Sequence, residues 1–128
     1  MEKKFMEVGQ LKTGNYVLID DVPCKIIGIE KSKPGKHGSA KARITAVGVF
    51  VNQKKTLMKP TSAGAESPII EKSSAQVIAK IGDKLQLMDL TSYATFDVLP
   101  DEEYSNLAAG TEVEYIKYGS DVKISRLK

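Results

Sequence analysis

One short segment of the sequence concentrates the residue types that could do chemistry or bind an anion. Residues 32–41, Ser-Lys-Pro-Gly-Lys-His-Gly-Ser-Ala-Lys, contain three lysines and the single histidine of the chain. Gly35 and Gly38 flank Lys36 and His37, and glycine can adopt the positive φ angles that tight turns require. Because the residues on both sides predict strands, we expect a hairpin loop here. The pattern predicts a cationic turn that presents Lys36 at its apex.

Two phosphate-binding motifs are similar to this segment, and each lacks a requirement. Residues 35–38 fit the G-x-x-G clamp of KH domains, but that clamp lies between helices and here the flanking residues predict strands. Gly35-Lys36 is similar to the end of a P-loop, yet Glu30 stands at the position of the partner glycine, and His37 replaces the Ser or Thr that holds magnesium. His37 is most simply an exposed loop residue that can stack on a base or donate to a phosphate.

The other chemistry-bearing residues have simpler structural explanations. With one cysteine, Cys24, the chain can form neither an internal disulfide nor a zinc site of several thiolates. Cys24 begins an apolar run, so a buried small side chain explains it better than a nucleophile paired with His37. The acidic pair at residues 20–21 fits turn chemistry, and the acidic run at residues 101–103 fits the start of a helix. We predict no catalytic residue and no metal site.

The charge of the chain is unevenly distributed. Residues 1–65 hold twelve Lys or Arg against five Asp or Glu, a net +7, whereas residues 66–128 hold seven against eleven, a net −4, and the sum is +3. No carboxylate occurs between Glu30 and Glu66, while eight Lys or Arg do. This asymmetry favours a polyanionic partner for the first half, although a solvated surface with its counter-charges in the second half would give the same counts.

The composition excludes several classes of protein. Hydrophobic residues make up 41% of the 128 residues, which argues against intrinsic disorder and suffices for one compact domain or two small ones. No apolar run approaches the roughly 20 residues that span a bilayer. The N-terminal residues lack the apolar core of a signal peptide. With a single cysteine as well, we expect a cytoplasmic protein with no membrane partner.

Short β-rich runs separated by turn residues occupy almost the whole chain. They are residues 16–19, 24–29, 42–51 and 56–59 in the first half, and 76–81, 85–90, 95–99, 112–118 and 122–127 in the second. Residues 104–110, after the acidic run, predict one short helix. Residues 60–68 are small or turn-forming and coincide with the charge reversal, so we expect the domain junction there. The pattern predicts an all-β fold of two small barrels, residues 1–67 and 68–128.

Several of these residues together match the pattern of one family. Residues 35–41 contain Gly-Lys-His-Gly followed by Ala-Lys, residues 11–17 are Leu-Lys-Thr-Gly-Asn-Tyr-Val, and residues 23–26 are Pro-Cys-Lys-Ile. In these motifs and their spacing the first half resembles the translation initiation factor 5A family, whose bacterial relative is elongation factor P. The second half fits more weakly, by length and strand pattern. The proline at position 34 resembles archaeal members of the family more than eukaryotic ones. The resemblance implies an N-terminal SH3-like barrel and a C-terminal OB-fold with one short helix.

The resemblance also implies a chemistry and a function. By position, Lys36 is the lysine that receives an aminobutyl group from spermidine through a deoxyhypusine synthase, sometimes followed by hydroxylation to hypusine. No bound cofactor is implied. Family members bind the ribosome, point the modified lysine toward the acceptor end of the peptidyl-tRNA, and promote peptide-bond formation at stalling sequences such as proline runs. The implied protein is a translation factor for initiation, elongation and termination, and is not an enzyme.

The residues around Lys36 are expected to contact the RNA. Cations beside the loop would bind phosphates and so set register rather than read sequence. The predicted RNA-contacting set is Lys31, Lys33, Pro34, Gly35, His37, Gly38, Lys41 and Arg43.

Two other functions compete with this interpretation. The first is a generic single-stranded RNA-binding protein that uses an OB-type barrel as its reader. Against it, the second half is net negative and its aromatic residues are not interleaved with Lys or Arg on one strand. The second is an RNA-cleaving enzyme that uses His37, which has no evident catalytic partner in the sequence.

Overall fold

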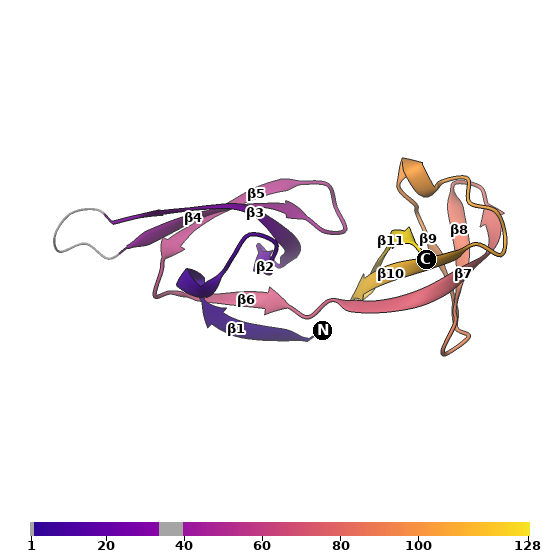
Figure 1. Cartoon of the computed structure of the whole chain (residues 1–128), viewed down its shortest axis with the longest axis horizontal. Coiled ribbons are helices and arrows are strands. Elements are labelled where there is room, and N and C mark those ends of the chain that lie inside the picture. Colours follow the sequence, from indigo (N-terminus) through magenta and orange to yellow (C-terminus); the bar gives the residue numbers. More distant parts are fainter. Residues whose placement is uncertain (1, 34–39) are drawn as a thin grey trace. The chain divides into compact units, whose positions relative to one another are not determined.

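The computed structural model describes residues 2–33 and 40–128, and nearly all of them form β-strands or the turns between strands (Figure 1). The apex of the predicted loop, residues 34–39, lies outside the described residues. The chain divides into two compact units, residues 1–69 and 70–128. The predicted domain boundary, between residues 67 and 68, remains a prediction of where the two domains separate.

The first unit contains a four-stranded antiparallel sheet in the order β2-β3-β4-β5 and a two-stranded sheet of β1 and β6. Its elements are β1 (Lys3–Glu7), the 3-10 turn η1 (Val8–Gln10), β2 (Tyr16–Ile19), β3 (Val22–Ser32), β4 (Lys41–Gly48), β5 (Lys54–Pro60) and β6 (Gly64–Pro68). The turn from β2 to β3 consists of Asp20 and Asp21, which both have positive φ, as a two-residue hairpin turn requires. This unit is the SH3-like barrel.

The period of two along the strands builds the core of the first barrel. On β4, Ala42, Ile44 and Ala46 are fully buried, while Lys41 before them and Arg43 between Ala42 and Ile44 are exposed. Successive strand residues point to opposite faces, so this alternation assigns one face of the sheet to the core and the other to solvent.

One strand of the first unit differs from the sequence prediction. Residues 64–68, which the sequence placed in the junction, form β6 because they pair with β1 and close the barrel. Ala65 enters the core, and the Ser67 hydroxyl donates a hydrogen bond to the carbonyl of Tyr16 at 2.8 Å. Tertiary pairing here overrides the weak strand propensity of Gly, Ala and Ser.

The second unit is a five-stranded antiparallel sheet in the order β11-β10-β7-β8-β9, and β9 also approaches β11. Its elements are β7 (Glu71–Ile81), β8 (Lys84–Asp89), β9 (Thr95–Val98), the 3-10 turn η2 (Glu102–Tyr104), β10 (Glu112–Tyr118) and β11 (Asp121–Leu127). A meander of three strands followed by a hairpin that returns to the first strand is the connectivity of the OB-fold, a partly open five-stranded barrel. The predicted all-β fold class of two small barrels is thereby confirmed.

The short helix of the second unit is a single 3-10 turn and does not extend over residues 104–110. The Asp101 side chain makes no capping hydrogen bond and pairs with Lys123 instead, at 3.3 Å. The Ser105 hydroxyl donates to the carbonyl of Glu102 at 2.8 Å, which satisfies that carbonyl locally and removes it from a longer helix.

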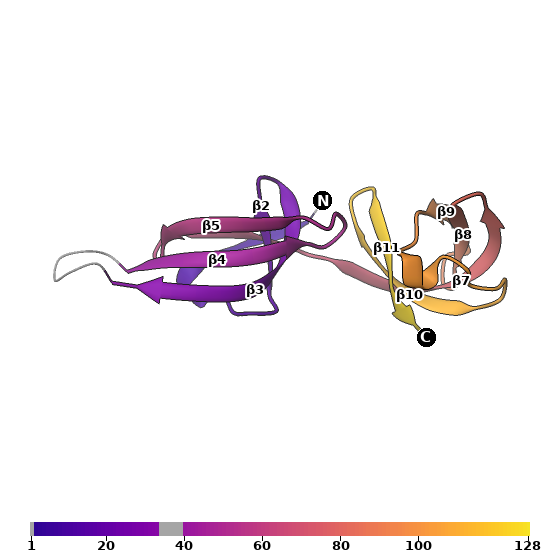
Figure 2. The same cartoon turned by 90° about the horizontal axis from the view of Figure 1, so that it is seen from above.

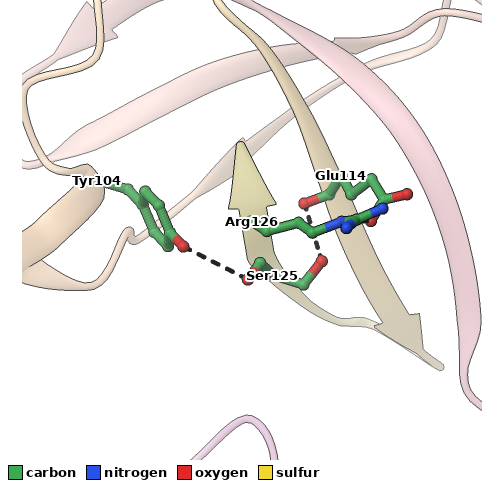
Figure 3. Close-up of polar contacts among 4 residues, drawn as sticks. All are labelled: Tyr104, Glu114, Ser125 and Arg126. Carbon is green, nitrogen blue, oxygen red and sulfur yellow. Dashed lines mark hydrogen bonds and ion pairs between the residues drawn. The ribbon is translucent and has the colours of Figure 1, made fainter. Parts of the chain in front are cut away.

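The 3-10 turn is attached to the edge of the sheet by polar contacts (Figure 3). The Tyr104 hydroxyl reaches the carbonyl of Ser125 at 3.4 Å. The Ser125 hydroxyl donates to the carbonyl of Glu114 at 3.1 Å, and Arg126 forms an ion pair with the Glu114 carboxylate. These contacts lie where the β10–β11 register shifts between Glu114 and Tyr115, so they fasten an irregular part of the ladder.

A buried carboxylate organises the loop between β8 and β9. Asp89 is only 6% exposed, and its carboxylate accepts the backbone N–H groups of Thr91 and Ser92, both at 2.8 Å, and the Tyr115 hydroxyl at 2.5 Å. These hydrogen bonds lower the pKa of Asp89 from its ordinary value of 3.8 to about 2, and the bond from Tyr115 has the largest effect. Burial of the hydroxyl is the largest cause, and the hydrogen bond to Asp89 the next, of a pKa of Tyr115 raised to about 12.

We expect the second unit to lose stability as the pH falls from about 4 to about 2. Asp89 is ionised in the folded state at pH values where it would be protonated when unfolded, so its contribution is present above the unfolded pKa and disappears as the pH falls through the folded one. The loss should be on the order of 1–2 kcal/mol. Denaturant unfolding across this pH range measures it.

The matched variants are Asp89→Asn and Asp97→Asn, since the Asp97 carboxyl is exposed on the neighbouring strand. The first variant should flatten the acid-side dependence and the second should leave it in place. An equal pH dependence in wild type and Asp89→Asn protein would contradict this role of Asp89.

Candidate functional site

The β3–β4 hairpin carries the predicted site and is paired as far as the structure describes it, with one register shift between Ile26 and Gly28. Cross-strand pairs run from Cys24 opposite Gly48 to Ser32 opposite Lys41. β4 lies between β3 and β5 over residues 41–47 (Figure 2). The predicted apex residues Pro34, Gly35, Lys36, His37 and Gly38 lie outside the described residues. The strands on both sides of the apex segment therefore remain paired up to Ser32 and Lys41.

The alternation of the hairpin separates the predicted RNA-contacting cations onto two faces. Lys41 and Arg43 alternate with buried Ala42 and Ile44, so they lie on the outer face of the sheet. Lys31 is opposite Ala42 in register and lies on the inner face, where its Nζ donates to the carbonyl of Gly9 at 3.0 Å. Lys33 follows β3 and is exposed. The structure thus brings Lys41 and Arg43 together and directs Lys31 elsewhere.

The outer face holds two further cations that the sequence interpretation did not include. Lys25 on β3 and Lys54 on β5 are both in register with Val47 on β4, one on each side of it. Together with Lys41 and Arg43 they make the outer face of β3–β5 cationic, with Glu30 as the one carboxylate within these three strands. The alternation of inward and outward residues along β3 and β5 was the sequence signal that could have placed Lys25 and Lys54 on this face.

Exposed apolar side chains accompany these cations. Met58 is opposite Arg43 in register and is 62% exposed, and Ile27 is 52% exposed where the β3–β4 register shifts. A polyanion with both phosphates and base or sugar surfaces matches such a mixed face better than inorganic phosphate does.

Cys24 has no chemical role in this arrangement. Its side chain is fully buried, and the thiol donates to the carbonyl of Val22 at 3.3 Å. Burial raises the pKa of the Cys24 thiol, which disfavours the thiolate that a nucleophile requires. The sequence interpretation of Cys24 as a small core residue agrees with this environment.

The described residues offer neither a metal cluster nor a membrane-spanning helix. No group of three or more His, Cys, Asp or Glu among residues 2–33 and 40–128 is placed to hold a metal ion. Over the same part of the chain, no helix has the length and hydropathy needed to cross a membrane.

The fold and the hairpin define a two-barrel β protein whose first barrel carries a cationic hairpin. Residues 2–63 match the family model described as translation initiation factor 5A-like, N-terminal. The chain is 52% identical to translation initiation factor 5A of Pyrobaculum arsenaticum, over 100% of both chains. It is also 52% identical to that of Methanopyrus kandleri, over 98% of this chain and 94% of the relative. The chain belongs to the translation initiation factor 5A family.

The comparison with solved structures agrees in fold as well as in sequence. The structure of eukaryotic translation initiation factor 5A from Methanococcus jannaschii matches with a TM-score of 0.91 and 47% identity, covering 98% of this chain and 95% of that one. A family protein from Naegleria fowleri matches with a TM-score of 0.77 and 30% identity over 100% of this chain. The resemblance found from the motifs is confirmed, and the protein is a translation factor.

The split between the faces predicts unequal effects of two substitutions that each remove one positive charge. Arg43→Gln should weaken binding of a short RNA hairpin several-fold and reduce the log–log salt slope by about 1, because Arg43 is exposed on the cationic face. Lys31→Gln should weaken it less, because the Lys31 ammonium is already bonded to Gly9. Fluorescence anisotropy at several salt concentrations measures both. Equal losses would contradict the assignment of these residues to different faces.

Proposed function

We propose that this translation factor binds the ribosome and presents a modified Lys36 to the acceptor end of the peptidyl-tRNA. In this proposal residues 1–67 form the domain that carries the loop, residues 68–128 form the OB-fold domain, and the protein acts in the cytoplasm. The observation that carries it is the Gly-Lys-His-Gly pattern at residues 35–38 on a paired cationic hairpin, in a chain that belongs to the translation initiation factor 5A family.

The modification is a substitution at the Lys36 amine. A deoxyhypusine synthase would break one C–N bond of spermidine and form a new C–N bond from the aminobutyl carbon to Nζ. The Lys36 amine gives up a proton and a diamine leaves, so the product has a longer side chain with a second amine. The neutral amine is the nucleophile, so the enzyme must take this side chain into its own site. Exposure of the flanking Ser32, Lys33 and Lys41 is compatible with such access.

The proposed mechanism is positioning. Proline is a poor nucleophile and distorts the nascent chain, so holding the end of the tRNA in a reactive geometry lowers an entropic barrier without a catalytic group from the factor. Lys33, Lys41 and Arg43 would hold phosphates and set the register of the protein on the RNA. Pro34, Gly35, His37 and Gly38 would form the close approach around Lys36, and Lys31 would support the base of the hairpin.

The alternative, a generic reader of single-stranded RNA, finds less support in the second barrel. Such readers stack bases on exposed aromatic rings in a positively charged groove. Here Phe96 and Tyr115 pack on each other with their centroids 4.9 Å apart, and Tyr115 is in the core. The second half is also net negative, with eleven carboxylates against seven cations.

The first test of the proposal is the mass of the protein purified from its native host. We expect an aminobutyl or hydroxylated aminobutyl adduct, and peptide mapping should locate it on Lys36. Protein from a host without the synthase serves as the unmodified reference. Native protein with an unmodified Lys36 would overturn the proposed modification.

The second test asks whether the modified side chain does the work. Lys36→Arg keeps the positive charge but removes the primary amine that accepts the aminobutyl group. We expect this variant to lose stimulation of proline-run synthesis in a reconstituted translation reaction, with unfolding unchanged. Lys33→Arg is the matched control and should retain the stimulation. A fully active Lys36→Arg protein would contradict the proposal.

A further inference from the structure

The first unit has a second cationic site, a surface hollow between the β1–β6 sheet and the turn before β2. The hollow measures about 550 Å3, and its polar side chains are Lys4, Gln10, Lys12, Asn15, Tyr16 and Ser67. Met6 and Pro68 supply apolar surface. No carboxylate lines it.

The two amide side chains of the hollow are oriented by the backbone. The Asn15 Oδ1 accepts the backbone N–H of Lys12 at 2.9 Å, and the Gln10 Oε1 accepts that of Glu7 at 3.3 Å. Each amide has one oxygen and one NH2 group, so these bonds leave both NH2 groups as donors. Neither NH2 group has a hydrogen-bond partner within the described part of the chain.

The backbone around these amides is held in place. Residues 12–15 form a turn in which the Asn15 N–H donates to the carbonyl of Lys12 at 3.0 Å and Gly14 has a φ of 93°, a conformation that glycine adopts easily. Bonds from the Gly14 N–H to the carbonyl of Ile26, and from the Ile26 N–H to the carbonyl of Asn15, tie this turn to β3. The donors are therefore presented by a preformed wall.

Two of the neighbouring carboxylates are already engaged. The Glu7 carboxylate accepts the backbone N–H of Gln10 in a capping box, and Glu66 forms an ion pair with Lys3. Lys4 and Lys12 have no ion-pair partner among residues 2–33 and 40–128. The hollow thus offers two ammonium groups and two amide NH2 groups, with few acceptors and no negative charge.

We propose that this hollow binds phosphates of an RNA backbone, as a contact separate from the hairpin. A donor-rich site without carboxylates selects an anion, and its place on the half that carries +7 favours a polyanion over a single ion. The choice of RNA rests on the proposed function, whereas the preference for an anion follows from the lining alone. Phosphate contacts of this kind position a protein on RNA and do not read its sequence.

The sharpest test is Asn15→Asp. An aspartate keeps the oxygen that accepts the Lys12 N–H, but it replaces the NH2 donor by a second acceptor and adds a negative charge. We expect unchanged thermal unfolding and a loss of affinity for a short RNA hairpin on the order of tenfold. The assay uses unmodified full-length protein, so its result does not depend on Lys36. Unchanged RNA affinity in a folded Asn15→Asp protein would overturn the site.

A second variant protects the test if Asn15→Asp disturbs the turn. Lys4→Gln with Lys12→Gln should lower the log–log salt slope by about 1.5 in magnitude. Lys72→Gln with Lys84→Gln, which removes the same charge from exposed positions of the second unit, should leave the slope unchanged. Equal slopes for the two double variants would also overturn the proposal.

Two further measurements distinguish the occupant. In an NMR titration with the RNA hairpin, the side-chain NH2 signals of Asn15 and Gln10 should shift, and absence of a shift would contradict direct contact. Poly-glutamate serves as the competing polyanion. If poly-glutamate displaced the RNA at equal charge concentration, the partner would be an acidic protein segment and the RNA assignment would be wrong.

Discussion

The antiparallel pairing of β3 with β4 is the constraint on which the first barrel and its hairpin both depend. The same alternation that buries Ala42 and Ile44 places Arg43 on the outer face. A slip of one residue would turn Arg43 into the core and expose the apolar residues. An unpaired buried charge costs several kcal/mol. The register that packs the core therefore also determines which face of the sheet carries the cations.

A single irregularity in this ladder explains why the cations separate. The β3–β4 register shifts between Ile26 and Gly28, and Ile27 at the shift is exposed. Before the shift the even-numbered Cys24 and Ile26 face the core, and after it the odd-numbered Ile29 packs against the core. Lys31 follows the new phase and reaches the carbonyl of Gly9. A bulge that inserts one residue changes the facing of everything beyond it.

The sequence predicts the strands with strong apolar alternation and misses what depends on distant partners. The runs that include Ile44 and Leu87 are evident because their pattern is local. Residues 64–68 form a strand only through pairing with β1, and the predicted helix shortens to a 3-10 turn because side chains bind its ends. The hairpin cations Lys41 and Arg43 were predictable from composition, but the donors of Asn15 and Gln10 were not. Their importance arises from backbone bonds that fix which end of each amide is free.

The two proposed anion-binding surfaces of the first barrel have a consequence for affinity that neither has alone. Once phosphates are held at the hollow, contact at the hairpin becomes an intramolecular step at an effective concentration of about millimolar. The groups that hold phosphate are individually weak and screened by salt, so they can release the RNA quickly. A preformed wall loses little conformational entropy on binding, which lowers the cost of association. Weak, rigidly spaced contacts on the barrel therefore suit the proposed function, in which the decisive group is one modified side chain, Lys36.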